Sequence, residues 1–489
     1  MESPQITSRL GLRDTPAWSR ADSVALLALL FLAAATRFWH LTTPAKMVFD
    51  EDILVPFARC YLNGIPYRGS HNPPLAALLV TLSIAIFGDN PLGWRLPGAL
   101  LGTALVGITY LLARRMFGRR LAGFVAGGMV ICDGLFLTQS RLALWEIPYL
   151  TLAACSYLLL FRFMAISDPR ASRGVLGWLA LTVGLCLGSK VLIPGLTAIL
   201  VGLFVAFAIV RASPENWNPL RVSRTMIASM ALFGGLSLFA YESVFIPNFW
   251  FGWWHGIIDQ LAYYRWIFNN DTSLGPKGHP YASPWWSWPL MLRPVQFFYN
   301  GSFLSDPNTK LSAIVELANP VIIFGVLGSI PLIALRAVRQ RDAASTFVTV
   351  GYLLYMAMWI PIRRFTFEYH YMPAMYLGSL ALAHLLGESW QGNLAWWEEM
   401  VLLATLLPPL VLGAGSVAGL TLAAATFMVY LALRRLSARS ADRFVTVLFA
   451  AFVLVAFVYF FPIWTAIPLS QASFQHRMWL HGPGLANWI

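Results

Sequence analysis

Residues 23–52 read SVALLALLFLAAATRFWHLTTPAKMVFDED, an apolar run, a short polar linker and three consecutive acidic residues. The apolar part, 23–39, is about as long as a helix needs to be to cross the hydrocarbon core of a bilayer. Because no small-residue cleavage site follows it, we expect a retained helix rather than a signal peptide. The stretch therefore predicts a membrane-spanning helix followed by an acidic loop.

Apolar runs of this kind recur along the whole chain. The 489 residues are 58% hydrophobic and 11% charged, whereas roughly a quarter of the residues of a soluble domain are charged. We predict an all-α polytopic membrane protein with about 11–13 transmembrane helices. The predicted spans are 23–39, 96–114, 121–137, 147–163, 175–189, 191–210, 225–246, 311–335, 343–361, 371–387, 399–414, 415–433 and 444–461. The last part of this pattern leaves open whether 399–433 is two spans or one re-entrant pair.

Basic residues sort the predicted loops onto two sides of the membrane. The N-terminus and five short basic loops fall on one side, which the positive-inside rule identifies as cytoplasmic. The polar segments 40–95 and 247–310 then lie outside, and the short apolar stretch from Pro73 to Phe87 is expected to be a juxtamembrane helix at the interface. The basic cytoplasmic loops also account for the net charge of +12 without a nucleic-acid ligand.

This topology divides the chain into three regions. A transmembrane core with the first external loop (40–95) spans 1–246. An external aromatic and basic loop spans 247–310, and a C-terminal transmembrane region spans 311–489. The two large external loops are the expected place of any chemistry, because they share one side of the membrane.

The first external loop contains the candidate catalytic acids Asp50 and Glu51, followed by Asp52. Neighbouring carboxylates repel one another, which raises the proton affinity of at least one of them and suits a general base. The alternative is structural, because Asp50 is placed to cap a helix that runs through Phe57 to Tyr61. The triplet alone leaves both interpretations open.

Positive charge on the external side is not explained by topology. Lys190 interrupts an apolar run, where an uncompensated cation costs ~2.5–3.5 kcal/mol. We therefore expect an anionic ligand, a salt bridge to Glu146 or Glu242, or a Lys190 side chain that snorkels to the surface. Arg141 closes another external hairpin, so the two cations are candidates for binding a lipid phosphate.

The second external loop is rich in tryptophan from His279 to Val295, and it includes Trp285, Trp286 and Arg293. An interfacial aromatic belt is the ordinary explanation for such a density of tryptophan. A platform for a sugar or an isoprenoid chain is the alternative.

The chain resembles the protein O-mannosyltransferases, members of the GT-C superfamily that use polyprenyl-phosphate-mannose. The matching stretches occur in the family's order: Phe49-Asp50-Glu51, His71-Asn72-Pro73-Pro74-Leu75, Trp94-Arg95-Leu96-Pro97, Asp133-Gly134, Gln139-Ser140-Arg141-Leu142-Ala143, Gly188-Ser189-Lys190, the block from His279 to Val295, Asn319-Pro320, Tyr369-His370-Tyr371-Met372-Pro373 and Pro462-Ile463-Trp464-Thr465. The block from His279 to Val295 is the most specific of them.

The resemblance implies a GT-C fold and an inverting transfer of mannose to Ser or Thr hydroxyls of exported polypeptides. Asp50 would be the base, Glu51 its neighbour, and Arg141, Lys190 and Arg293 would bind the donor phosphate. Substrate contacts would come from His71, Glu146, His279, Trp285, Trp286 and His370. No metal ligand is assigned, and the sequence leaves the need for a divalent metal open. The expected place is a bacterial plasma membrane, with the N-terminus cytoplasmic and the active site external; the partners are the lipid donor, the acceptor polypeptide and membrane lipid.

Departures from the family pattern keep two alternatives open. The family's His-Pro-Pro-Leu-Gly-Lys becomes His71-Asn72-Pro73-Pro74-Leu75-Ala76-Ala77, without the lysine, and its second-loop Asp is replaced by Glu146. An enzyme of the same architecture that uses another sugar, or a lipid or glycan acceptor, is the first alternative. A secondary transporter is the second, although the notable acids cluster at one face and no internal repeat is found.

Overall fold

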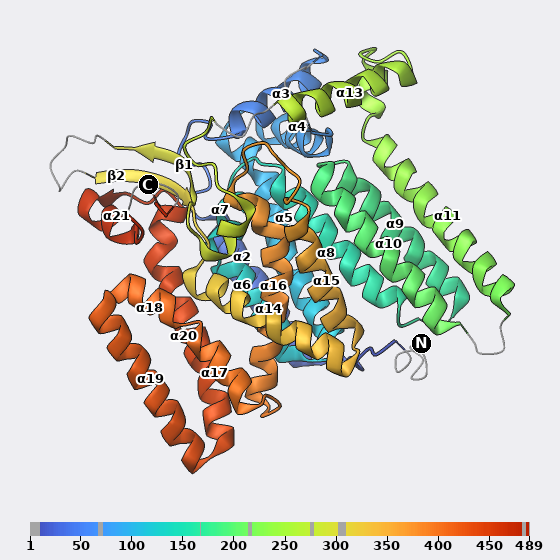
Figure 1. Cartoon of the computed structure of the whole chain (residues 1–489). Coiled ribbons are helices and arrows are strands. Elements are labelled where there is room, and N and C mark those ends of the chain that lie inside the picture. Colours follow the sequence, from blue (N-terminus) through green and yellow to red (C-terminus); the bar gives the residue numbers. More distant parts are fainter. Residues whose placement is uncertain are drawn as a thin grey trace. The chain divides into compact units, whose positions relative to one another are not determined.

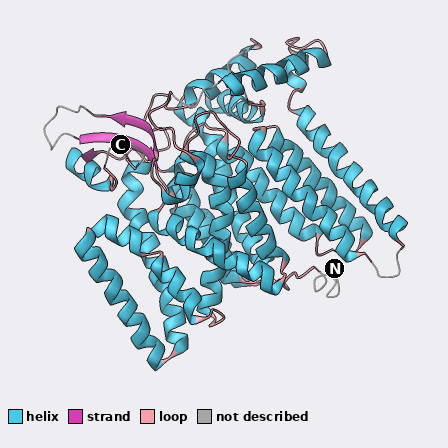
Figure 2. Cartoon of the chain, in the orientation of Figure 1, coloured by secondary structure: helices cyan, strands magenta, loops and turns pink. Residues whose placement is uncertain are grey.

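The computed structural model describes residues 10–66, 72–166, 168–213, 218–273, 278–301, 310–481 and 486–488. Within these residues the regular secondary structure is helical apart from three short strands (Figures 1 and 2). Eight of the helices in this part are long and apolar enough to cross a membrane, or nine if one bent pair is a single span. The predicted helical, multi-pass membrane fold is therefore confirmed. The chain forms two compact units.

Unit 1 comprises Met1–Gly118, Gln139–Pro276 and Asp342–Phe347. Its helices are α2 (Arg20–Phe38), α3 (Glu51–Asn63), α4 (Leu75–Phe87), α5 (Pro91–Phe117), α8 (Glu146–Phe163), α9 (Pro169–Leu187), α10 (Leu192–Ala212), α11 (Pro219–Ser243), α12 (Ile246–Trp250) and α13 (Ile257–Ser273). The long helices pack as a layer in which α2 contacts α5, α5 contacts α8, α8 contacts α9 and α9 contacts α11 (Figure 1). The short helices α3 and α4 pack on each other, and α4 packs on α5.

Helices of unit 1 begin at strong local signals. Asn90, Asp168 and Asn218 each accept hydrogen bonds from backbone N–H groups of the first turn, and a proline follows each of them at the first helical position. Within α5, Gly102 allows close packing, because an added Cβ would lie 2.3 Å from the Cβ of Ser140. These features fix α5 against the turn that leads to Arg141.

The position of α3 is set by an apolar cluster that it shares with α4. Its members from α3 are Leu54, Val55, Phe57, Ala58 and Tyr61, all buried, and they pack with side chains of α4, Trp94 and the segment 143–145. Each large apolar side chain buried in this way contributes about 1.5–3 kcal/mol. The predicted juxtamembrane stretch from Pro73 to Phe87 is thus confirmed as a helix, and its packing holds the beginning of α3 in place.

Unit 2 comprises Arg119–Thr138, Lys277–Arg341 and Val348–Ile489. Its elements are α6 (Arg120–Cys132), most of α7 (Gly134–Ser140), η1 (Trp285–Leu290), β1 (Val295–Asn300), β2 (Lys310–Glu316), α14 (Pro320–Gln340), η2 (Glu368–Tyr371), α16 (Met372–Trp390), α17 (Trp396–Ala404), α18 (Leu407–Ala414), α19 (Ser416–Leu436), α20 (Ala438–Trp464), β3 (Leu469–Ser470) and α21 (Gln471–Arg477). Helix α15 (Ala343–Ala357) is divided between the units. The buried helix α16 packs against α6, α14 and α20.

The predicted span 311–335 is wrong at its beginning. Residues 310–316 form β2, which pairs antiparallel with β1 and with β3. Helix α14 begins only at Pro320, where Asn319 caps it by accepting a hydrogen bond from the Val321 N–H at 3.1 Å. The apolar pattern runs across this boundary because β2 is buried on both faces, and a buried strand has the composition of a helix core.

A polar node holds the bend between α6 and α7, which measures 63°. Asp133 accepts hydrogen bonds from the N–H groups of Leu135 and Asn319, at 3.0 and 2.8 Å. Gly134 is required there, because an added Cβ would lie 2.1 Å from the carbonyl oxygen of Leu317. The Asp133-Gly134 and Asn319-Pro320 stretches therefore meet at one structural joint of unit 2.

Candidate active site

The acidic turn joins α2 to α3 in unit 1. Phe49 has a φ of +51°, a left-handed conformation that is strained for a residue with a Cβ. The turn places Asp50 at the N-cap position of α3, as the structural alternative expected, but the Asp50 carboxylate makes no capping hydrogen bond. Within the described residues no hydrogen bond to this carboxylate is found, so it is uncommitted.

Asp50 lies among charged side chains of unit 1. Burial raises the pKa of the Asp50 carboxyl to about 7. The negative charges of Glu146 and, to a smaller extent, Asp52 raise this pKa further, whereas the positive charge of Lys190 lowers it. A carboxyl group that titrates near neutral pH can accept a proton during a reaction and release it afterwards. The geometry of the turn therefore suits a general base.

Glu146 and Lys190 form a salt bridge beside Asp50, with 2.6 Å between the Lys190 Nζ and the Glu146 Oε1 atoms. The Lys190 Nζ also lies 6.0 Å from the centre of the Tyr149 ring. Of the partners considered for Lys190, the structure confirms Glu146. The pair brings two sequence-predicted site residues next to Asp50.

Glu51 is fully buried and paired with Arg95 of α5. The two groups meet as a fork, with 2.8 Å from Arg95 Nε to Glu51 Oε1 and 2.8 Å from Arg95 Nη2 to Glu51 Oε2. The carboxylate also accepts the N–H groups of Val48 and Ala143, each at 3.0 Å. Arg95 donates in addition to three carbonyls of the linker, those of Leu41, Pro44 and Lys46. Glu51 therefore ties the acidic turn to α5 and to the segment before α8.

Arg141 is buried against the end of α2. Its Nη1 donates to the carbonyls of Thr36 and Arg37 at 2.9 and 3.0 Å, and its Nη2 to that of His40 at 3.3 Å. Burial lowers the pKa of Arg141 to about 10, helped by the neighbouring charge of Arg95, so the guanidinium stays charged at neutral pH. In the structure, three backbone carbonyl oxygens bind the Arg141 guanidinium. Its contact with a donor phosphate stays a prediction.

The remaining predicted site residues belong to unit 2, with the exception of His71, which lies outside the described residues. The His279 ring contacts Phe365 and Phe367, and His370 is buried between Trp288 and Trp359. Trp285 is half-buried and Trp286 is exposed. Arg293 donates from Nε and Nη2 to the carbonyl of Pro280, at 3.1 and 2.7 Å. In unit 2, the segments 279–293 and 365–370 thus bring these aromatic and basic residues together.

Two buried groups were missed as site residues from the sequence. Arg95 is one; an arginine near the start of an apolar helix is expected to have a carboxylate partner, which the structure identifies as Glu51. Glu368 of unit 2 is the other, fully buried, with no hydrogen-bond partner for either carboxylate oxygen among the described residues. No group of three or more His, Cys, Asp or Glu side chains in the described part of the chain is arranged to hold a metal ion.

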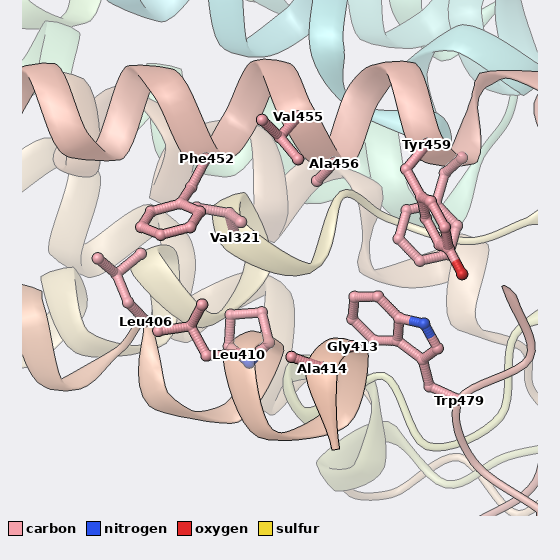
Figure 3. A pocket seen from close by; sticks show the side chains of 12 residues that line it. Val321, Leu406, Leu410, Gly413, Ala414, Phe452, Val455, Ala456, Tyr459 and Trp479 are labelled. Atoms are coloured by element: carbon pink, nitrogen blue, oxygen red, sulfur yellow. The ribbon is translucent and has the colours of Figure 1, made fainter. Parts of the chain in front are cut away.

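Unit 2 also contains an apolar pocket, and none of the predicted site residues lines it. It has a volume of about 210 Å³ and lies between α14, α18, α20 and the segment after α21, with Phe452, Leu410 and Trp479 among its lining residues (Figure 3). The lining carries no charged side chain. Such a pocket suits hydrocarbon rather than a sugar phosphate.

Two family models match the chain, and their order follows the sequence. The model described as dolichyl-phosphate-mannose-protein mannosyltransferase matches residues 27–251. The model described as the C-terminal four TMM region of protein-O-mannosyltransferase matches residues 259–482. The two matches together leave only the ends and a short junction unassigned.

Relatives and solved structures agree with these models. The polyprenol-phosphate-mannose–protein mannosyltransferase of Mycolicibacterium smegmatis is 24% identical, over 94% of this chain and 93% of the relative. The protein of the same name from Mycobacterium tuberculosis is 23% identical, over 92% and 90%.

Among solved structures, the protein O-mannosyltransferase complex of S. cerevisiae bound to the sugar donor is similar with a TM-score of 0.75 and 14% identity, over 98% of this chain and 94% of that chain. ArnT from Cupriavidus metallidurans bound to undecaprenyl phosphate has a TM-score of 0.55 and 14% identity, over 91% and 77%. At this level of identity the structural likeness establishes the fold.

Proposed function

Because the chain belongs to the protein O-mannosyltransferase family of GT-C glycosyltransferases, we propose that it transfers mannose with inversion, with Asp50 as the general base. It is a multi-pass membrane enzyme that uses a polyprenyl-phosphate-mannose donor and a protein acceptor. We place the reaction at Ser or Thr hydroxyls of exported polypeptides, at the outer face of the plasma membrane. The positive-inside pattern of the basic loops supports this orientation.

The observation that carries the proposal is the uncommitted carboxylate of Asp50. In a single displacement, the acceptor hydroxyl oxygen attacks the anomeric carbon, its proton passes to the Asp50 carboxylate, and the bond from that carbon to the phosphate oxygen breaks. The polyprenyl phosphate leaves with the bonding electrons. This step needs one base on the acceptor side, which Asp50 provides.

The state of the other carboxylates supports inversion. A retaining double displacement needs a second carboxylate as nucleophile. Glu51 is occupied by Arg95 and two backbone N–H groups, and Glu146 is paired with Lys190. Since Asp50 is the buried carboxylate of this turn for which the described residues show no partner, a single displacement fits the site better than a two-step path.

The phosphate side of the reaction requires cations, which stabilise the charge that develops on the leaving group. We assign this role to Arg141 and Lys190 of unit 1 and to Arg293 of unit 2. His71, Glu146, His279, Trp285, Trp286 and His370 are proposed to contact the substrates. The Lys190 pair with Glu146 holds its ammonium beside the proposed base, so that a bound phosphate competes with Glu146 for Lys190.

The function is tested by incubating the purified protein with polyprenyl-phosphate-mannose and a Ser/Thr-containing peptide. We expect a peptide with one added hexose and an anomeric configuration opposite to that of the donor, as read by NMR. A product that keeps the donor configuration would exclude the single displacement. Transfer only to a lipid or glycan acceptor would exclude the polypeptide as substrate.

A further inference from the structure

A second candidate site of unit 1 lies at the end of α3 opposite the acidic turn. It is a cleft of about 490 Å³, and we name it the aromatic cleft; its walls include Tyr61, Asn248, Trp253, Trp254, Tyr263 and Trp266. Helices α3 and α13, which supply part of its wall, gather with α4 at one end of unit 1 (Figure 1). Its volume falls in the range of ligand-binding sites, about 300–1,000 Å³.

The rings of the aromatic cleft are held in fixed positions by stacking. Phe245 is fully buried, and its ring stacks on Trp254 with 5.3 Å between the centres. Trp254 contacts Tyr263 at 5.4 Å, and Tyr263 stacks on Trp266 at 6.3 Å. Since these rings lose little freedom when a ligand binds, they provide contact area at a low entropic cost.

Hydrogen bonds hold the other edge of the cleft. The Tyr61 hydroxyl donates to the Asn248 Oδ1 at 2.5 Å, the Trp253 indole N–H donates to the carbonyl of Gly64 at 3.1 Å, and the Tyr263 hydroxyl donates to the carbonyl of Asn72 at 2.9 Å. The bonds connect α3, α12, α13 and the segment before α4. The cleft is therefore preorganised rather than formed by loose side chains.

The polar groups of the cleft select among possible ligands. Asp259 lies in its wall and is partly exposed, so it presents a negative charge to any occupant. That charge disfavours a lipid phosphate, and the buried amide of Asn248 would be left without water beside a hydrocarbon chain. An extended polypeptide satisfies both requirements, because it carries N–H and C=O groups between apolar side chains.

The position of the cleft along α3 relates it to the acidic turn. Tyr61 follows Asp50 by eleven residues, and α3 covers nearly all of them. At 1.5 Å per residue this separation is roughly 16 Å along the helix. An extended chain advances about 3.3 Å per residue, so roughly five residues span the same distance.

We propose that the aromatic cleft binds the acceptor polypeptide at a segment about five residues from the hydroxyl that is modified. The inference rests on the proposed function, since it assumes that the hydroxyl reacts at Asp50. Apolar side chains of the acceptor pack against the parts of Trp254 and Tyr263 that line the cleft, while its backbone meets the polar groups at the edge. The enzyme would thus recognise the length and the flanking sequence of its acceptor in addition to the hydroxyl.

The test compares two acceptor peptides that share one Thr, a short one with two flanking residues on each side and a long one with ten. We expect the wild-type protein to have a lower KM for the long peptide. Trp254→Ala should raise that KM about tenfold, the usual size of effect for a buried tryptophan contact, so that the long peptide loses its advantage. Tyr263→Phe, which keeps the ring, should have a smaller effect.

Trp250→Ala is the matched control, because Trp250 is 84% exposed on the neighbouring helix α12 and does not line the cleft.

Different outcomes separate the two proposals. If the wild-type protein modifies neither peptide, the proposed function fails. If it modifies both with the same KM, or if Trp254→Ala raises the KM for both peptides equally, the cleft does not bind the acceptor. A rise in the KM for the lipid donor instead would assign the cleft to the polyprenyl chain and overturn the inference.

Discussion

Asp50→Asn is expected to reduce mannosyl transfer by roughly 10²–10⁴-fold while the protein stays folded. The loss follows from the chemistry, because an amide cannot accept the proton of the acceptor hydroxyl. The fold is expected to persist because asparagine has nearly the same shape and the Asp50 side chain makes no capping hydrogen bond that could be lost. The measurement is the initial rate with saturating donor and peptide, together with the thermal unfolding midpoint in detergent.

Asp52→Asn is the matched control for this substitution. Asp52 is exposed and lies two residues further along the same helix. Its neutralisation removes one of the smaller electrostatic influences on Asp50, so we expect a rate within about threefold of the wild type, well below the loss of a general base. If Asp50→Asn transfers mannose as fast as Asp52→Asn, Asp50 is not the base.

Arg95→Leu is expected to destabilise the protein strongly. The substitution leaves the Glu51 carboxylate buried without its cation, and three carbonyls of the 41–46 linker lose their donor. Breaking a buried ion pair costs about 3–5 kcal/mol. The expected result is a large fall in the unfolding midpoint, together with loss of activity because the acidic turn is no longer held.

The control for Arg95→Leu is Arg59→Leu on α3. Arg59 pairs with Asp89 in a fork of the same kind, with distances of 2.8 and 3.1 Å, but both side chains are partly exposed, at 35% and 43%. Exposed ion pairs contribute about 0–1 kcal/mol, so this variant should unfold close to the wild type. Equal unfolding midpoints for the two variants would mean that Glu51 and Arg95 do not secure the turn.

The helices and the order of the motifs could be predicted from the sequence, because both are local properties. The runs of apolar residues mark the spans, but the helices capped by Asn90, Asp168 and Asn218 begin before the predicted starts at 96, 175 and 225, because their first turns are less apolar. The acidic turn after the first span was recognisable for the same reason. The role of Asp50 could not be predicted, because in the sequence the same residue is a possible helix cap and a possible general base.

Tertiary contacts account for what could not be predicted. Glu51 is next to Asp50 in the chain, yet it is fully committed to Arg95, which lies 44 residues further on. Only the structure separates the two acids into a positioning residue and an uncommitted carboxylate. The boundary at Pro320 was missed because most residues of β2 are buried and its apolar residues lead directly into those of the helix that follows. The aromatic cleft combines residues of α3 with residues about 190 positions later, so no local pattern reveals it.

The most direct measurement of the central claim is the dependence of kcat/KM on pH. Since Asp50 must be ionised to accept the proton, and its pKa is raised to about 7, the rate should be constant above that pH and fall about tenfold per unit below it. In Glu146→Gln the negative charge that raises the pKa of Asp50 is gone, so the fall should begin at a lower pH, by roughly one unit. A rate that is flat from pH 5 to 8 in the wild type, or a fall that Glu146→Gln moves to higher pH, would contradict the assignment of Asp50 as the general base.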